Sequence, residues 1–352
     1  MDRMKAALLF QREKASLKPG EPVTDLRVVE IDKPETGNND ILTRVRACSV
    51  CPTDYRKYLT GNHGVPWWPF NPGHEWAGDV VEVGSEVKEF DVGDRITGMG
   101  YAGYAEYAKI VGRYGDYGTI VVPPFAGCNK LPDNVTYEEG GIAIPLAECI
   151  ESIINVCKVK ILDNVAVIGA GPMGIMNAMV AKAIGATVFV SDLLEHRLKL
   201  AEELGMDYVI NPKEEEPVEY VKKHTGGKGA DSVVCSIAHP AVIEQGLKMA
   251  RRGGIVNIFG GATEETRVNF NPNLIHYGVL SVTASYGTGG HWDLGKKALQ
   301  LISSGKVDVK KIVTARYPLD QALDAVKHVG SKEGMKAIIY PDPKDIPSKD
   351  RD

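Results

Sequence analysis

The stretch Asn164–Gly174, with the sequence NVAVIGAGPMG, decides the fold of the second half of this chain. Its apolar start has the length and composition of a buried strand, and a helical pattern of apolar residues follows as far as Ile184. Between the two, Gly169 permits a tight turn, Gly171 lets the backbone approach a pyrophosphate, and Gly174 lets the helix pack close to the strand. The order of strand, turn and helix predicts a dinucleotide-binding unit.

The residues around this turn complete the predicted cofactor site. Pro172 and Met173 begin the helix, whose free N–H groups and positive dipole end face the phosphates. Asp192 follows the next predicted strand at about the ~20-residue spacing of the acidic residue that binds the adenosine ribose. Its charge would repel a 2′-phosphate, which favours NAD over NADP. The alternative is a Gly-rich connection with a surface Asp that caps the next helix. From spacing alone, Arg197 is a solvated helix residue rather than a phosphate contact.

Two regions with different patterns of predicted secondary structure indicate two domains. From about residue 155, apolar strands alternate with helical patterns, which is typical of βαβ units in a parallel sheet. Before about residue 110, short runs such as Asp40–Cys48 and Glu75–Val83 are separated by Asp, Gly and Pro turns, which predicts an all-β, barrel-like region. After the βαβ region, a helix is expected at Asp293–Ser303 and a strand at Lys336–Tyr340.

Composition excludes several classes of function. The 352 residues are 43% hydrophobic and 25% charged with a net charge of −5, so no basic surplus favours nucleic-acid binding. No run approaches the ~18 apolar residues of a membrane span, and the N-terminus has no signal-peptide core. Six cysteines in a chain of this length are not a disulfide framework. We therefore expect a cytoplasmic protein with a small-molecule partner and neither nucleic acid nor membrane.

Two clusters in the β-rich half carry metal-ligand chemistry. Cys51 precedes Thr53 and Asp54, and His74 precedes Glu75. A thiolate and an imidazole suit zinc, which in catalytic sites takes three protein ligands and keeps one position open. Asp54 is suited to hold the far nitrogen of His74. Taken alone, one Cys and one His equally fit a buried thiol and a hydrogen-bonded core histidine.

Taken together, these motifs resemble the zinc-dependent medium-chain alcohol/polyol dehydrogenase superfamily, which includes sorbitol, threonine and alcohol dehydrogenases. The resemblance implies a GroES-like β-barrel catalytic domain at residues 1–154 and 294–352. It also implies an inserted Rossmann domain at residues 155–293. The matching segments run in order along nearly the whole chain: Cys51-x-Thr53-Asp54, Gly73-His74-Glu75, Gly84, Val92-Gly-Asp-Arg95, Gly169–Gly174 and Asp192.

The resemblance also implies roles for single residues. Cys51 and His74 would be zinc ligands, and Thr53 would hydrogen-bond the substrate hydroxyl. Glu75 would lie beside the metal as an exchanging ligand or as a support for the ligands. Arg197 would be a cofactor contact beside the adenosine ribose, because many relatives carry a basic residue at that place.

The third fixed zinc ligand is expected near the segment Ile144–Glu148. Polyol-type relatives often carry Glu directly before the Pro of this segment, where this chain has Ile144. Glu148 offers a competent carboxylate and is the predicted third ligand. Cys149 and Glu151 are fallback ligands, whose alternatives are helix packing for the thiol and a solvated charge for the carboxylate.

The chain departs from the family pattern in two places. The structural zinc of some relatives is held by four closely spaced cysteines, whereas Cys128 is the one cysteine within residues 100–130 of this chain. The structural zinc is therefore expected to be absent, which leaves one catalytic zinc per chain. Arg56 stands where the family often has a proton-relay His. The proton is therefore expected to leave through Thr53 and the cofactor ribose, or through Tyr55 or water.

Two loops carry the candidate substrate contacts. The first contains His63, Trp67 and Trp68, whose indole faces would stack on sugar C–H groups. The second is the Gly-rich segment Ser285–Trp292, where His291 is a candidate contact. The alternatives are core or interface packing for the two Trp residues and a surface loop position for His291. The resemblance favours a secondary alcohol of a polyol, cyclitol or sugar.

Three hypotheses follow, of which a zinc- and NAD-dependent polyol dehydrogenase is favoured. A zinc-free, NADPH-dependent quinone or enone reductase on the same fold is disfavoured by the metal-ligand candidates and by Asp192. A non-catalytic NAD-binding protein is disfavoured by Thr53 and Asp54. The resemblance further implies a homodimer or homotetramer, joined through the last Rossmann strand around Val279–Ala284, which would otherwise leave an exposed sheet edge.

Overall fold

The computed structural model describes residues 2–13, 15, 17–61, 68–113, 115–117, 120–288 and 290–348. The chain divides into two compact units: unit 1 comprises Met1–Ile144 and Gly295–Asp352, and unit 2 comprises Pro145–Leu294. The sequence predicts these boundaries after residues 154 and 293, whereas the packing places them after residues 144 and 294. The first boundary therefore falls inside helix α2 (Tyr137–Ile150).

Unit 2 is built on a six-stranded sheet whose neighbouring strands all pair in parallel. The strand order is β11-β10-β9-β12-β13-β14, which is that of a doubly wound nucleotide-binding fold with its reversal point between β9 and β12. The predicted Rossmann sheet is thereby confirmed. Its strands are β9 (Asn164–Ile168), β10 (Thr187–Ser191), β11 (Tyr208–Ile210), β12 (Ala230–Cys235), β13 (Ala250–Ile258) and β14 (Ser281–Ala284).

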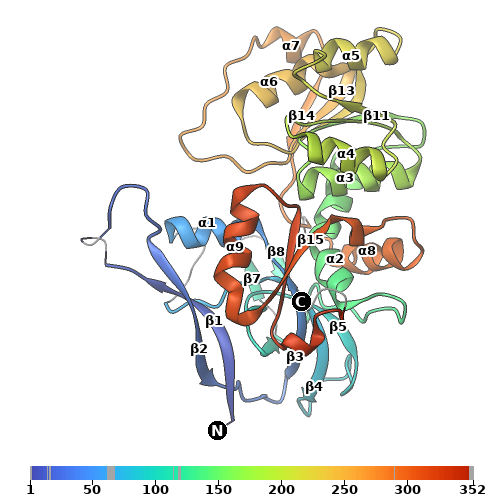
Figure 1. Ribbon diagram of the computed structural model, residues 1–352. Coiled ribbons are helices and arrows are strands. Elements are labelled where there is room, and N and C mark those ends of the chain that lie inside the picture. Colours follow the sequence, from blue (N-terminus) through green and yellow to red (C-terminus); the bar gives the residue numbers. More distant parts are fainter. Residues whose placement is uncertain are drawn as a thin grey trace. The chain divides into compact units, whose positions relative to one another are not determined.

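Helices cover both faces of this sheet, which explains the apolar, buried runs Val165–Ile168 and Val233–Cys235 in its central strands. Figure 1 shows α3 and α4 on one side of the sheet and α5 and α6 on the other. Four of the five residues of β9 are buried, as are eight consecutive residues of α3. The helical elements of unit 2 are η2 (Glu151–Val156, a π-helix), α3 (Pro172–Ile184), α4 (Glu195–Glu203), α5 (Pro217–His224), α6 (Pro240–Met249) and α7 (Asn273–His276).

Unit 1 is organised around β3 (Asp40–Ser49), which pairs antiparallel with three other strands, β4, β6 and β16. Thr43, Val45 and Ala47 of β3 are buried, whereas Arg44 and Arg46 between them are half-buried. This alternation follows the two-residue period of a strand. The other strands are β1 (Arg3–Gln11), β2 (Thr24–Asp32), β4 (Glu75–Val83), β5 (Arg95–Met99), β6 (Tyr107–Val111), β7 (Gly115–Tyr117), β8 (Ile120–Val122), β15 (Val313–Pro318) and β16 (Lys336–Tyr340).

The C-terminal part of the chain completes the unit 1 sheet after the insertion of unit 2. β16 pairs with β3 on one side and in parallel with β15 on the other, so the order is β15-β16-β3-β4-β5. The predicted strand Lys336–Tyr340 is found at these residues, and the predicted helix Asp293–Ser303 is α8 (Leu294–Ser303). The remaining helical elements are η3 (Val309–Ile312), η4 (Leu319–Gln321), α9 (Ala322–Ser331) and η5 (Pro343–Asp345).

One prediction for unit 1 is wrong, because the region before residue 110 is not all β. Helix α1 (Pro52–Thr60) begins directly after Cys51. Pro52 fits the first turn of a helix, and Cys51 and Asp54 form a reciprocal capping box at its start. Gly61 ends the helix in the left-handed conformation, with φ of 64°. No helix among the described residues is long and apolar enough to span a membrane.

Candidate functional site

A cluster of three potential metal ligands lies in unit 1 where β3 and β4 meet. Ser49, at the end of β3, pairs with Glu75, at the start of β4, so the residues just beyond this pair are neighbours. Cys51 follows on one side and His74 precedes on the other. One ligand atom from each of Cys51, His74 and Glu75 lies within 4.8 Å of the others. The pairing of two strands thus brings together a thiol, an imidazole and a carboxylate.

Asp54 orients the imidazole of His74. The carboxylate is almost fully buried, and its Oδ1 lies 3.6 Å from Nδ1 of His74. Its Oδ2 accepts hydrogen bonds from the Tyr104 hydroxyl at 2.9 Å and from the Cys51 amide at 3.4 Å. Burial alone would raise the pKa of Asp54, but His74 beside it lowers that pKa below its usual value. Asp54 is therefore ionised and faces the ring nitrogen Nδ1.

The same contacts act on His74. Burial would lower the pKa of His74, but Cys51 and Asp54 together raise that pKa well above its usual value. Nδ1 of His74 and Oδ1 of Asp54 are both buried and lack a hydrogen-bond partner among the described residues. With Nδ1 facing a carboxylate, Nε2 is the nitrogen left for a metal, as in many zinc sites. The donor set and this orientation fit a zinc ion held by Cys51 and His74.

Lys336 is a site residue that the sequence analysis missed. Its side chain is fully buried, and its Nζ lies 2.5 Å from Oε2 of Glu75. The Ser49 hydroxyl donates to the same oxygen at 2.7 Å. Burial would lower the pKa of Lys336, but Glu75 raises that pKa above its usual value, so the ammonium stays charged. Oε2 is thus occupied by two donors, and Oε1 is the oxygen of Glu75 left for a ligand.

Lys57 is a second buried cation beside the cluster. It lies on α1 and is 1% exposed, and its Nζ lies 4.9 Å from the ring centre of Tyr101. The Tyr101 ring in turn packs edge-on against His74, with 5.6 Å between the ring centres. The sequence gives little signal for this position, because a Lys inside a helix usually faces solvent.

The structure places the other predicted residues of unit 1 as follows. Thr53 is half-buried in the first turn of α1, next to Cys51. Arg56, on the same helix, is exposed. Trp68 is half-buried and packs against the main hydrophobic core of the unit. His63 and Trp67 lie outside the described residues, so their predicted substrate contacts stay predictions.

In unit 2, the glycines of the predicted nucleotide turn have the backbone properties that the turn requires. Gly169 has φ of 100°, a left-handed conformation that L side chains rarely adopt. A Cβ on Gly174 would lie 1.8 Å from the carbonyl oxygen of Gly169, so only glycine fits there. Gly171 is the N-cap of α3 and no side chain caps the helix, which leaves the first amides after Pro172, including that of Met173, for an anion.

Asp192 and Arg197 lie beside this turn. Oδ2 of Asp192 accepts a hydrogen bond from the Ala170 amide at 2.7 Å, and Oδ1 accepts one from the Leu194 amide at 2.9 Å. The guanidinium of Arg197 lies 3.6 Å from the same carboxylate, and its side chain is only 11% exposed. The solvated position inferred from spacing alone is therefore wrong for Arg197. Its Nη1 lies 3.5 Å from where a Cβ on Gly171 would be, so it borders the turn.

Comparison with known proteins identifies the family of this chain. Residues 37–133 match the family described as "Alcohol dehydrogenase GroES-like domain", and residues 172–304 match "Zinc-binding dehydrogenase". The sorbitol dehydrogenase of Ovis aries is 34% identical over 346 residues, covering 91% of this chain and 95% of that protein. The chain belongs to the zinc-dependent medium-chain alcohol/polyol dehydrogenase superfamily. The L-threonine 3-dehydrogenase of Thermococcus kodakarensis is 32% identical over the same length, covering 91% of this chain and 96% of that one.

Solved structures share the fold of this dehydrogenase. The 2R,3R-butanediol dehydrogenase from Bacillus subtilis superposes with a TM-score of 0.81 at 25% identity, covering 96% of this chain and 100% of that one. A zinc-binding dehydrogenase from Sinorhizobium meliloti, solved with NADP bound, superposes with a TM-score of 0.82 at 24% identity, covering 97% and 100%.

The candidates for the third zinc ligand of the dehydrogenase all lie in unit 2. Glu148 is half-buried, and its role as a ligand stays a prediction. Cys149 is fully buried, and its Sγ accepts a hydrogen bond from Nδ2 of Asn177 at 3.4 Å, as expected for helix packing. Glu151 is 6% exposed rather than solvated, and its Oε2 lies 2.8 Å from Nδ1 of His291. His291, a predicted substrate contact, is thus a half-exposed partner of a buried carboxylate.

Replacing Lys336 by Met should destabilise the dehydrogenase by about 3 kcal/mol, because a buried pair that loses one partner leaves an uncompensated charge on the other. Chemical denaturation monitored by tryptophan fluorescence measures the free energy of unfolding. Lys336→Arg should recover much of the loss. Lys5→Met is the matched control, since Lys5 pairs with Asp320 at 3.3 Å on the surface and should contribute little. A Lys336→Met variant as stable as the native protein would contradict this account of Glu75.

Proposed function

We propose that this protein oxidises a secondary alcohol of a polyol, cyclitol or sugar with NAD as the hydride acceptor and one zinc ion per chain. The observation that carries the proposal is the cluster of Cys51, His74 and Glu75 with Asp54 behind the imidazole. Cys51 and His74 would hold the zinc, with Glu148 as the third fixed ligand and Glu75 as an exchanging one. A zinc-free reductase would have no use for this arrangement of thiol, imidazole and buried carboxylate.

The residues of unit 1 have separate tasks in this reaction. Bound zinc supplies Lewis-acid polarisation of the substrate oxygen, which lowers the pKa of the alcohol. The Thr53 hydroxyl, in the first turn of α1 and two residues after Cys51, would hydrogen-bond the substrate hydroxyl and pass its proton on. Asp54 keeps the His74 ring in a fixed orientation, and Lys336 with Ser49 holds the Glu75 carboxyl group in place. Arg56, at the position where relatives often have a proton-relay His, is exposed and carries no exchangeable lone pair for a relay. The proton would therefore continue through Thr53 and the cofactor ribose, or through Tyr55 or water.

The residues of unit 2 would hold the nucleotide, whose nicotinamide accepts the hydride. The uncapped start of α3 at Gly171 offers amide donors and a positive dipole end to the pyrophosphate. Asp192 would accept hydrogen bonds from the adenosine ribose, since each of its oxygens keeps a lone pair beyond its contact with a backbone amide. Arg197 would border the ribose from the other side of the turn.

The preference for NAD over NADP rests on how firmly Asp192 is held. Both of its oxygens accept backbone hydrogen bonds, so the carboxylate cannot swing away to admit a 2′-phosphate. The 2′-phosphate would therefore meet a fixed negative charge. The guanidinium of Arg197, 3.6 Å from the Asp192 carboxylate, offsets part of this repulsion. The preference for NAD over NADP is therefore limited.

A polyol or sugar substrate is favoured by the side chains available and by the relatives. Trp68 packs against the core of unit 1 but is only half-buried, so the exposed part of its indole would contact the substrate. His291 and Glu151 would form a polar, partly exposed pair for hydroxyl groups. Relatives that are 30–34% identical include sorbitol dehydrogenases, which supports a substrate with several hydroxyl groups. Trp67 and His63 belong to the same proposed contact set.

We also propose a homodimer or homotetramer in a reducing cytoplasm. β14 is the last strand of the unit 2 sheet, three of its four residues are exposed, and Val282 is 41% exposed. An exposed sheet edge of this kind would pair with a second copy through its backbone N–H and C=O groups. No disulfide joins any of the six cysteines, all of which lie among the described residues.

Native protein purified without chelator should carry one zinc per chain, and Cys51→Ala should lose both the metal and NAD-dependent alcohol oxidation. The physical reason is that removing one thiolate from a site of three fixed ligands leaves too few donors. Inductively coupled plasma mass spectrometry measures the metal content. Cys128→Ala, which removes a half-buried thiol outside the cluster, is the control and should keep the zinc. Native protein that stays zinc-free after supplementation would rule out the proposed metal site.

Replacing Asp192 by Ser should lower kcat/KM for NAD relative to NADP by at least about tenfold, because the repulsive charge is removed. Arg197, released from its partner, would then be able to bind the 2′-phosphate. Steady-state rates at 340 nm with each cofactor give the ratio. Asp163→Ser, on a turn of the same unit, is the control and should leave the ratio unchanged. A ratio that does not move in Asp192→Ser would show that another residue sets the cofactor preference.

A further inference from the structure

A cavity of about 460 Å³ opens at the amino-terminal edge of the unit 2 sheet. It is lined by Asn164, the first residue of β9, by Arg251 and Arg252 near the start of β13, and by the loop that leads into β12. The Gly169–Gly174 turn follows the carboxyl end of β9. The cavity therefore lies at the opposite end of the strands from the proposed nucleotide site.

The cavity carries an excess of positive charge. Lys228, Arg251 and Arg252 line it together with a single carboxylate, Asp231, so its formal charge is three minus one, or +2. The whole chain, in contrast, has a net charge of −5. Concave surfaces lined by one sign of charge concentrate the field and attract small ions of the opposite sign. The lining thus favours an anion.

Asp231, whose negative charge is already subtracted in this sum, is fully engaged by neighbouring residues. Its carboxylate forms an ion pair with Arg251 and accepts hydrogen bonds from the backbone amide of Asn164 at 2.8 Å and from its Nδ2 at 3.3 Å. Burial would raise the pKa of Asp231, but Asn164 and Arg251 lower that pKa below its usual value. The Lys228 ammonium, in contrast, forms no ion pair with any residue that the structure describes.

The loop that carries Lys228 is held in place by its own backbone. The Gly227 amide donates to the Lys222 carbonyl at 2.7 Å, and the Gly229 amide donates to Oγ1 of Thr225 at 2.9 Å. Gly229 has φ of 94°, and a Cβ there would lie 2.5 Å from the carbonyl oxygen of Met249, so the turn requires glycine. The backbone of Lys228 is therefore fixed at the rim, although its side chain is solvent-exposed.

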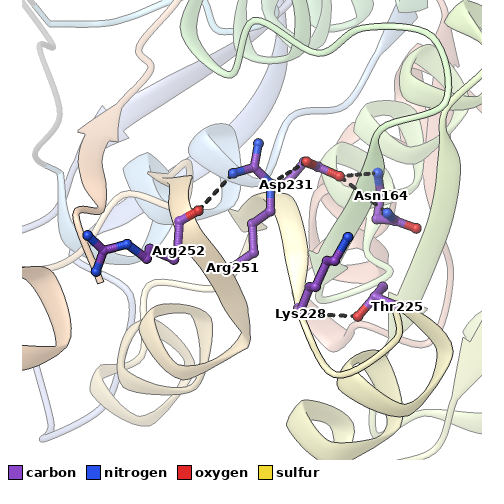
Figure 2. Close-up of a pocket in the computed structure, with 7 residues that line it drawn as sticks. Asn164, Thr225, Lys228, Asp231, Arg251 and Arg252 are labelled. Atoms are coloured by element: carbon purple, nitrogen blue, oxygen red, sulfur yellow. Dashed lines mark hydrogen bonds and ion pairs between the residues drawn. The ribbon is translucent and has the colours of Figure 1, made fainter. Parts of the chain in front are cut away.

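The side chains differ in direction. Figure 2 shows the Lys228 and Arg251 side chains directed toward the Asn164–Asp231 pair, whereas that of Arg252 points away from the others. Arg252 donates from Nη1 to the Tyr277 carbonyl at 2.7 Å, so it adds charge nearby rather than a direct contact. Arg251 uses Nε for Asp231 and Nη1 for the Arg252 carbonyl, which leaves Nη2 for a ligand. Lys228 Nζ and Arg251 Nη2 are the two available donors.

We propose that this cavity binds the phosphate group of a small phosphorylated metabolite, as a second site that is independent of the dehydrogenase activity. A phosphomonoester carries a charge near −2 at neutral pH, which matches the +2 of the lining. Ammonium and guanidinium groups are the usual hydrogen-bond donors to phosphate oxygens in proteins. The cavity is several times larger than a phosphate group, so it has room for a small organic body beside the Thr225 and Asn164 side chains.

Isothermal titration calorimetry with inorganic phosphate and with methyl phosphate tests the proposal directly. The zinc-loaded protein is kept at constant ionic strength and saturated with NAD, so that phosphate does not enter the nucleotide site. Neither probe has an oxidisable secondary alcohol, so binding is measured whether or not the proposed reaction is correct. We expect one saturable site per chain, and affinity roughly tenfold weaker in Lys228→Gln, since one charge-assisted contact is lost.

The controls separate a built site from general charge. Lys223→Gln removes an equal charge from the exposed surface of α5 without touching the cavity and should bind like the native protein. Lys228→Arg should restore most of the affinity lost in Lys228→Gln. The proposal is overturned by the absence of saturable binding, or by an equal loss of affinity in Lys223→Gln and Lys228→Gln.

Discussion

The buried ion pair between Lys336 and Glu75 is the interaction on which unit 1 depends. It joins residues 261 positions apart and links β16, the last strand along the chain, to Glu75 of the cluster of potential metal ligands. Two opposite charges can be buried in a protein when they pair with each other and when their other polar atoms form hydrogen bonds. Here the Ser49 hydroxyl supplies such a hydrogen bond by donating to Oε2 of Glu75. The pair forms only when β16 pairs with β3, although the whole of unit 2 lies between these two strands in the sequence. The same contacts hold the Glu75 carboxyl group beside Cys51 and His74.

The two ends of the unit 2 sheet have different chemistry. At the carboxyl end of β9, the glycine turn and the uncapped helix α3 offer backbone amides, and the nearby charges of Asp192 and Arg197 face each other at 3.6 Å. At the amino end, Asn164 begins the same strand and borders a cavity with excess positive charge. The first arrangement suits the proposed nucleotide site and the second suits the proposed phosphate site. A parallel sheet can hold both because each end collects loops from several strands.

Much of this organisation could be predicted from the sequence, because the signals are local. The segment Asn164–Ile184 contains strand, turn and helix in one continuous pattern, and the structure has them at those residues. The cluster of potential metal ligands could be predicted from two local motifs. Cys51 closely follows one recognisable strand, and His74–Glu75 stands at the start of another. Helix α1 was missed because it has nine residues and its N-cap is Cys, which is not a usual capping residue. Lys336 and the burial of Arg197 could not be predicted, because both depend on partners that only tertiary packing brings near.

Direct hydride transfer from a carbinol carbon to the nicotinamide can be followed with an isotope label. Sorbitol and related polyols deuterated at the secondary carbinol carbon are incubated with NAD and the zinc-loaded protein, and the reduced cofactor is isolated for mass spectrometry. If the hydride moves directly, the reduced cofactor carries one deuterium for each ketone formed. Reduced cofactor without the label, or no reduction by any polyol while NADPH reduces an enone, would show that the protein does not perform this transfer.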